Sequence, residues 1–270
     1  MQLQLFQVDA FAEKPFEGNP AAVVPLERWL DDEVMQKIAM ENNLSETAFF
    51  VRTGEGAYDL RWFTPMSEIA LCGHATLASA WVVFNKLAPA LSRVAFSTQS
   101  GILTVERAEH DLLAMSLPAF EARPHAKGRA FGAALGEAFR REPLEVFSAN
   151  YALAVFADES DIKALQSGGA LATTLANYDE PGLMVTAKGG ASGFDFVSRF
   201  FVPGKGIAED PVTGGAHAAL VPFWARRLGK TKLRARQMSA RGGTLICELQ
   251  GERVVLKGKC VPFLTGMIAL

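Results

Sequence analysis

The chain has 270 residues, of which 49% are hydrophobic and 21% charged, and its formal net charge is −2. This composition is typical of a globular protein of one large or two ordinary domains, and it excludes a strongly basic nucleic-acid-binding surface. Apolar runs are too short to span a bilayer, and the N-terminal residues alternate as in a strand rather than a signal peptide. Three widely spaced cysteines without a CxxC pattern argue against disulfides or a cysteine zinc site. We therefore expect a cytoplasmic protein that binds neither a metal nor nucleic acid and does not associate with a membrane.

In chain order, short β-branched and aromatic runs alternate with a few helical patterns. The runs are bounded by Gly, Pro, Asn or Asp, as strands usually are. Helices are expected over residues 31–42, around 128–140 and around 159–166. Residues 74–87 and 214–228 are apolar on nearly all sides, so these two helices should be buried on every side. The pattern predicts an α+β protein rich in strands.

Two distant segments resemble each other. "RWFTPMSEIA" (61–70) and "RFFVPGKGIA" (199–208) share five of ten residues, and after a three-residue insertion "GHATLASA" falls over "GGAHAALV". Each segment is expected to read as strand, loop, glycine-marked helix start and buried helix. The repeat predicts two pseudo-symmetric domains, one over residues 1–118 and one over residues 119–270.

Pseudo-symmetric halves commonly meet at a cleft, and both buried helices are expected to begin there. One begins near Gly73 and His74, and the other near Gly214 and Gly215. A helix N-terminus offers unpaired N–H groups and a partial positive charge, and glycine allows close approach to the backbone. These features predict a socket for a small carboxylate or enolate.

Three side chains near these helix starts could transfer protons. Glu46 directly precedes an apolar strand, where a partly desolvated carboxylate suits general acid–base catalysis; the alternative is a surface residue at the strand entry. His74 could bind a substrate carboxylate or shuttle a proton, or it could be satisfied by the backbone at a helix terminus. Asp210 precedes a proline and a helix start, so capping is its simplest role. Its neighbour Glu209 is expected to be solvated.

Further positions close to the helix starts have less specific patterns. Cys72 precedes Gly73, where a helix N-terminus could lower the pKa of the thiol. A two-thiol racemase would need a second cysteine in "DPVTGG", which has none. His217 lies inside the second buried helix and is expected to be structural. Pro222 should kink that helix or lie beyond a shortened one.

Four segments together resemble the phenazine-biosynthesis isomerase-like (PhzF-like) family of the diaminopimelate-epimerase-like fold. They are "QVDAFAEKPFEGNPAAVV", "NLSETAFF", "FTPMSEIALCGHATLASA" and "GIAEDPVTGGAHAAL". The similarity runs from the first strand to about residue 243. It implies two domains, each a β-barrel wrapped around a central helix, with the active site in the cleft between them. It also implies an isomerase without a cofactor, commonly a homodimer.

The same resemblance implies roles for individual residues. Glu46 would move a proton between carbons, while His74 and Asp210 would bind and polarise the substrate. The substrate would also be held at the helix starts, by Gly73, Thr213, Gly214 and Gly215. The family usually has serine where this chain has Gly215, so one hydroxyl contact is missing.

The sequence thus predicts a cofactor-independent isomerase or epimerase of a small carboxylic acid, with Glu46 as the general acid/base. One alternative is a racemase or dehydratase of an amino or hydroxy acid that uses Cys72. Another, motivated by Gly215, is a non-catalytic protein that binds a small acid. A metal-dependent hydrolase that uses Glu46, His74 and Asp210 is the remaining alternative.

Overall fold

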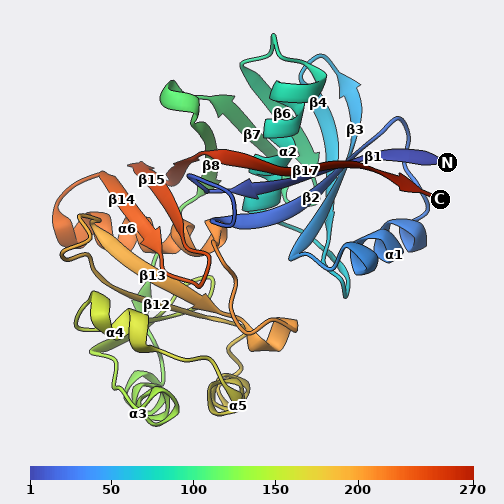
Figure 1. Ribbon diagram of the computed structural model, residues 1–270. Coiled ribbons are helices and arrows are strands. Elements are labelled where there is room, and N and C mark those ends of the chain that lie inside the picture. Colours follow the sequence, from blue (N-terminus) through green and yellow to red (C-terminus); the bar gives the residue numbers. More distant parts are fainter. The chain divides into compact units, whose positions relative to one another are not determined.

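The computed structural model describes all 270 residues, apart from the side chain of Lys205. The chain divides into two compact units, one of Met1–Leu117 with Val255–Leu270 and one of Pro118–Val254. The first break lies beside the boundary expected at residue 118. The end of the chain, expected in the second domain, belongs instead to the first unit, because β17 (Cys260–Ala269) pairs along its length with β1 (Gln2–Ala10) (Figure 1). The repeated segments do not include this strand, so the repeat could not reveal its partner.

The first unit is built on a mixed sheet around one buried helix. The sheet continues from β1 through strands that pair in the order β2 (Asn19–Leu26), β3 (Glu46–Gly54), β4 (Ala57–Phe63), β6 (Arg93–Thr98), β7 (Gly101–Arg107) and β8 (Leu113–Pro118). The short β5 (Glu68–Ile69) adds to β4. The expected helix at 31–42 is α1 (Asp32–Asn42), which buries Met35, Ile38 and Ala39 against the sheet.

The expected buried helix at 74–87 is confirmed. It consists of α2 (Gly73–Val82) and a π-helical turn, η1 (Val83–Leu87). Within α2 all residues except Gly73 and Trp81 are buried. The helix contacts β1, β2, β3, β7 and β17, so strands surround it on several sides. Small side chains such as Ala75 and Ala78 let these strands approach the helix closely.

The second unit repeats the pairing pattern of the first. Parallel, antiparallel, parallel and antiparallel pairs follow one another along β11 (Ala152–Val155), β12 (Leu183–Lys188), β13 (Phe196–Phe201), β14 (Lys232–Gln237) and β15 (Gly243–Gln250). The same alternation runs along β2, β3, β4, β6 and β7. The second unit also contains the short strands β9 (Arg123–Pro124) and β10 (Glu145–Ser148), and β16 (Arg253–Gly258) runs from the second unit into the first. The pairing confirms that the sequence repeat is also a structural one.

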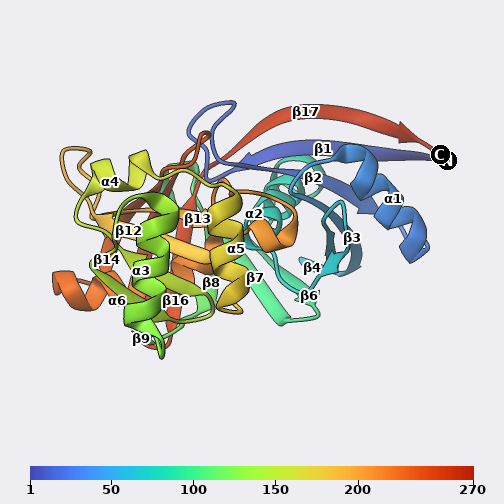
Figure 2. The ribbon, with the colours of Figure 1, turned by 90° about the horizontal axis from the view of Figure 1, so that it is seen from below.

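Helices cover part of the second sheet. The two expected helices are α3 (Gly128–Phe139) and α4 (Glu159–Ala164). The sequence did not predict α5 (Gly169–Asn177), which lies beside α3 (Figure 2). These helices bury Phe131, Leu135, Ile162, Leu171 and Leu175 in one cluster with the strands.

The buried helix of the second unit is α6 (Gly214–Leu228), as expected. It is buried from Ala216 to Ala225 and extends through Pro222, so of the two alternatives for Pro222 the shortened helix is wrong. Proline has no N–H for the carbonyl four residues before it. That carbonyl, of Ala218, instead accepts the backbone N–H of Phe120 at 2.9 Å. Among the helices of the described chain, none is both long and apolar enough to cross a membrane.

Candidate active site

Two of the predicted residues, Glu46 and His74, meet in the first unit. Glu46 is the first residue of β3, and His74 is the second residue of α2. The Glu46 Oε2 atom lies 3.0 Å from His74 Nε2, and the two side chains are 15% and 5% exposed. Within the described chain, the angles at this contact fall short of a hydrogen bond, and neither atom has another hydrogen-bond partner. An acid and a base are therefore in contact, withdrawn from water, with polar atoms left for a ligand.

The opposite edge of the His74 ring faces two further polar groups. The Nδ1 atom lies 3.1 Å from Asn19 Nδ2 and 3.5 Å from Cys72 Sγ. Asn19 is fully buried at the start of β2 and follows Gly18. Gly18 has a φ of 70°, and a Cβ there would lie 2.2 Å from the carbonyl oxygen of Ala10, so only glycine fits. Asn19 was not predicted as a site residue, although a Gly-Asn pair directly before a strand was a possible signal.

Burial and close contacts shift the pKa values in this cluster. Burial raises the pKa of Cys72 to about 11, and the nearby Glu46 carboxylate contributes to the shift. The thiol is therefore protonated at neutral pH, and the expectation that the helix start lowers its pKa is wrong. Burial alone would lower the pKa of His74, but its contacts with Cys72 and the Glu46 carboxylate outweigh burial, and the pKa lies well above its ordinary value.

The same three side chains include ligand types that bind metals. One ligand atom each from Glu46, Cys72 and His74 lies within 4.8 Å of the other two. Zn²⁺ accepts thiolate, imidazole and carboxylate ligands, but Cys72 would first have to lose its proton. The cluster thus provides suitable atoms for a thiophilic ion, at the cost of ionising a buried thiol.

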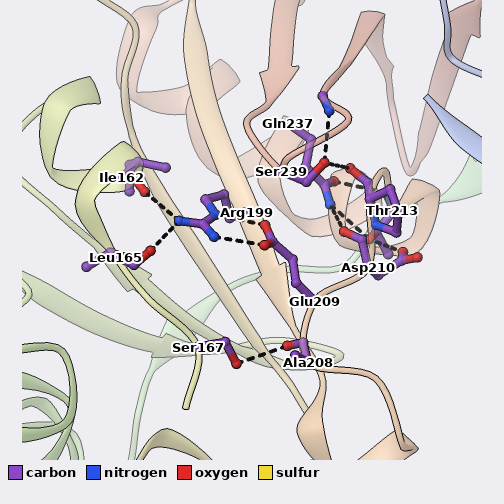
Figure 3. A network of polar contacts seen from close by, with 12 residues as sticks. Ile162, Leu165, Ser167, Arg199, Ala208, Glu209, Asp210, Thr213, Gln237 and Ser239 are labelled. Atoms are coloured by element: carbon purple, nitrogen blue, oxygen red, sulfur yellow. Dashed lines mark hydrogen bonds and ion pairs between the residues drawn. The ribbon is translucent and has the colours of Figure 1, made fainter. Parts of the chain in front are cut away.

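Asp210 lies in a second constellation, in the second unit (Figure 3). Its carboxylate accepts a hydrogen bond from the hydroxyl of Thr213, and its backbone N–H donates to the carbonyl of Phe200 at 3.0 Å. The fully buried Gln237 of β14 accepts the Thr213 N–H at 2.9 Å and donates to the Asp210 carbonyl at 2.7 Å. Asp210 is therefore held just ahead of α6 and does not act as its cap. Gln237 was missed because its partners lie far away in the sequence.

Both buried helices begin without a side-chain cap. Their N-cap residues are Cys72 and Thr213, and neither side chain, in the chain as described, accepts a hydrogen bond from its own helix. The first N–H groups of a helix have no partner inside it, so the backbone at Gly73, Gly214 and Gly215 offers donors to an anion. A Cβ at Gly215 would meet nothing within 4 Å. Each helix start belongs to its own unit, and each is suited to hold a negative charge.

The expectations for two further residues of the second unit, His217 and Glu209, had different outcomes. His217, expected to be structural, is fully buried: its Nδ1 lies 2.8 Å from the Thr213 carbonyl, and burial lowers its pKa to about 4. Glu209 was expected to be solvated, but its side chain is only 16% exposed. It is paired with Arg199, which reaches it from the adjacent strand β13.

Comparisons with known proteins agree with this architecture. The chain matches the family model of phenazine biosynthesis-like protein, PhzC-PhzF, over residues 8–266. It is 51% identical to a Pseudomonas aeruginosa protein named an uncharacterized isomerase, with both chains covered completely. A PhzF-family phenazine biosynthesis protein of Enterococcus faecalis has a TM-score of 0.91 at 42% identity, again over both whole chains. A hydroxyproline epimerase of Agrobacterium vitis shares only the fold, with a TM-score of 0.63 at 12% identity over all of this chain and 93% of that one. The chain therefore belongs to the phenazine biosynthesis-like PhzC-PhzF family and has a diaminopimelate-epimerase-like fold.

Proposed function

We propose that this isomerase works without a cofactor and moves a proton between carbons, or between the two faces of one carbon, of a small carboxylic acid. The observation that carries the proposal is the 3.0 Å contact of Glu46 Oε2 with His74 Nε2 in a nearly dry environment. A positioned carboxylate and imidazole are suited to general acid–base catalysis. The names of relatives as isomerases and epimerases support the same class of reaction.

In the proposed reaction, Glu46 takes a proton from an activated carbon. The C–H bond breaks, an O–H bond forms on Glu46, and the electron pair moves onto an oxygen of the substrate as an enolate. His74 stabilises this charge, because its raised pKa favours the protonated ring. Unpaired N–H groups at the start of α2 assist by electrostatic attraction. Glu46 then returns its proton to another carbon or to the opposite face, so the overall change needs no oxidant or reductant.

Asp210 is proposed to bind the substrate rather than to take its proton. An ionised Asp210 repels a carboxylate, so the carboxylate is assigned to N–H groups at Gly214 and Gly215. Asp210 is assigned to a hydroxyl or amino substituent of the substrate. Its bond from the Thr213 hydroxyl orients the carboxylate for this role.

Deuterium uptake from heavy water into a panel of small amino, hydroxy and unsaturated acids, followed by NMR, tests the proposal. Glu46→Gln should slow the uptake by about 10²–10⁴-fold, which is the usual contribution of a positioned acid–base group. Glu41→Gln, a change at an exposed position of α1, serves as the matched control and should leave the rate unchanged. Near-full uptake by Glu46→Gln would contradict the assignment.

The same experiment separates the alternatives. Uptake that survives in Glu46→Gln but is lost in Cys72→Ser would indicate a racemase or dehydratase that uses Cys72. The raised pKa of Cys72 argues against this, because the protonated thiol is a poor base. Binding of an acid without any uptake would indicate a small-acid-binding protein.

The homodimer implied by the family stays a prediction. In the first unit, β17 exposes the apolar side chains of Phe263, Leu264 and Met267, which a second copy could cover. Sedimentation equilibrium measures the mass in solution. A monomer at micromolar concentration would contradict the prediction.

A further inference from the structure

The loop before each buried helix is held by an arginine and a glutamate in the same geometry. In the first unit, Arg61 Nε lies 2.7 Å from Glu68 Oε1, and Arg61 Nη2 lies 2.8 Å from Glu68 Oε2. In the second unit, Arg199 and Glu209 repeat both contacts at 2.7 and 2.8 Å (Figure 3). Each pair is bidentate, an arrangement that fixes direction as well as distance.

The backbone around the two pairs is equivalent as well. In each unit the phenylalanine two residues after the arginine pairs with the glutamate across an antiparallel bridge, Phe63 with Glu68 and Phe201 with Glu209. The guanidinium carbon of Arg61 lies 5.2 Å from the ring centre of Phe63, and that of Arg199 lies 4.9 Å from the ring centre of Phe201. The two glutamates therefore occupy corresponding places.

A serine holds each loop two residues further on. The hydroxyl of Ser100 donates to the carbonyl of Ala70 at 2.7 Å, and that of Ser239 donates to the carbonyl of Pro211 at 2.8 Å. The parallel pairs β4–β6 and β13–β14 place these serines at matching positions, each just past the end of its strand. Both serines therefore hold the loop from equivalent strands.

The correspondence continues into the helices. The N-cap residues Cys72 and Thr213 follow their glutamates at the same distance along the chain. The side chain four residues later bonds back to the N-cap carbonyl in both units: Thr76 Oγ1 donates to Cys72 at 2.6 Å, and His217 Nδ1 lies 2.8 Å from the Thr213 carbonyl. Glu68 therefore corresponds to Glu209, whereas the sequence comparison had aligned the Ile-Ala pair after Glu68 with the Ile-Ala pair before Glu209. The three-residue insertion of the second unit thus lies before its glutamate and not after its alanine.

The two ion pairs fix the conformation of their loops more than they add to the free energy of unfolding. The side chains of Arg199 and Glu209 are 10% and 16% exposed, and those of Arg61 and Glu68 are 23% and 24% exposed. Partly buried ion pairs add little net stability, because desolvation offsets their attraction. Arg199 also donates to the carbonyls of Ile162 and Leu165, and thus ties its loop to α4. A bidentate pair at this place restrains the chain that carries the reactive side chains.

We propose that these two sets are equivalent positioning latches, the first made of Arg61, Glu68 and Ser100 and the second of Arg199, Glu209 and Ser239. The first latch sets the position of Cys72 and His74, and the second sets the position of Asp210 and Thr213. The catalytic part of this inference rests on the proposed function. Its structural part, the restraint of the two helix starts, can be measured without any substrate.

Amide hydrogen exchange followed by NMR tests the restraint. Ser239→Ala should speed exchange at the N–H groups of Thr213 and His217 by about 3–10-fold, which corresponds to the one lost hydrogen bond to the loop. The variant also removes the hydrogen bond that Ser239 accepts from the N–H of Gly242, so faster exchange at Gly242 itself is expected. Ser100→Ala should do the same at Thr76, with a smaller effect because Ser100 is exposed. Ser239→Thr and Ser100→Thr keep the hydroxyl and should restore the wild-type rates. Faster exchange over the whole unit, or no change at these amides, would overturn the proposal.

Kinetics of deuterium uptake then test the catalytic part. Glu68→Gln should lower kcat about tenfold with little change in KM, because its latch carries His74. Glu209→Gln should raise KM about tenfold with a smaller change in kcat, because its latch carries Asp210. A merely structural role would reduce kcat in both variants through a smaller folded fraction and would overturn the assignment. If no acid is turned over, the proposed function fails. Hydrogen exchange in the serine variants still tests whether the two latches restrain the helix starts.

Discussion

The starts of α2 and α6 share one scaffold but have different chemistry. His74 of α2 takes the place that Gly215 has in α6, and it contacts Glu46 through atoms without other hydrogen-bond partners in the described chain. At the start of α6, Gln237 bonds to the backbone of both Asp210 and Thr213. In the proposed mechanism the first helix start exchanges a proton, whereas hydrogen bonds with Gln237 hold the loop before the second helix start. The same backbone framework therefore carries different side chains and different contacts in the two units.

The largest expected effect concerns the contact that only the first helix start has. Glu46→Gln and His74→Gln should each slow deuterium uptake by about 10²–10⁴-fold. The double variant should be no slower than the slower single variant, because the two residues act as one unit. Rates of all four proteins give the double-mutant cycle. Independent, multiplying losses would show that the contact has no catalytic meaning.

Next in size is the opposite behaviour of the two helix histidines towards pH. Burial lowers the pKa of His217 from 6.5 to about 4, so the folded state holds fewer protons there than the unfolded state. Its stabilisation is complete above pH 6.5 and is lost as the pH falls towards 4, by about 3 kcal/mol in total. Urea unfolding between pH 4 and 7 measures this loss. His217→Thr, which copies Thr76 of the first helix, should have a flatter profile; an unchanged profile would contradict the assignment.

His74 should contribute with the opposite sign. Its pKa is raised in the folded state, so its stabilisation is complete below the ordinary value of 6.5 and is lost as the pH rises through the folded value. Unfolding of His74→Gln at alkaline and acidic pH checks the sign. A variant that loses more stability at high pH than at low pH would contradict it.

A smaller effect is expected at the second helix start. Asp210→Asn keeps an acceptor for the Thr213 hydroxyl but removes the charge. The loss of a charge-assisted hydrogen bond to substrate should raise KM by about 10–100-fold, with the melting temperature nearly unchanged. Steady-state kinetics on the acid found by deuterium uptake measures KM. An unchanged KM would exclude Asp210 from substrate binding.

The smallest expected effect comes from Gly215→Ser. The added side chain meets open space, and serine is well tolerated in the first turn of a helix. The fold should therefore be unchanged, and KM for a substrate that can use the hydroxyl should fall by less than about tenfold, the value of one neutral hydrogen bond. Thermal unfolding and KM of the variant check both statements. A large loss of stability would show that the site needs glycine for its backbone.

Local patterns in the sequence were sufficient for the elements that hold the site. Apolar residues on nearly all sides of α2 and α6 predicted that both helices are buried, because a helix without a polar face has no side that favours contact with water. Glu46, His74 and Asp210 were selected as candidate site residues because each stands at the border of an apolar element, where a polar side chain is unusual. Gly215 and the absent second cysteine were visible as departures from a pattern.

Tertiary structure alone decided which groups those residues meet. The place of β17 beside β1, the bonds from Gln237 to the loop before α6, and the ion pair of Arg199 with Glu209 all join residues that local periodicity does not relate. Periodicity reports which face of an element avoids water, whereas hydrogen bonds and ion pairs depend on register between strands that are distant in sequence. For the same reason the repeat was visible in the sequence, while the exact place of its insertion followed only from the bridges of Phe63 to Glu68 and of Phe201 to Glu209.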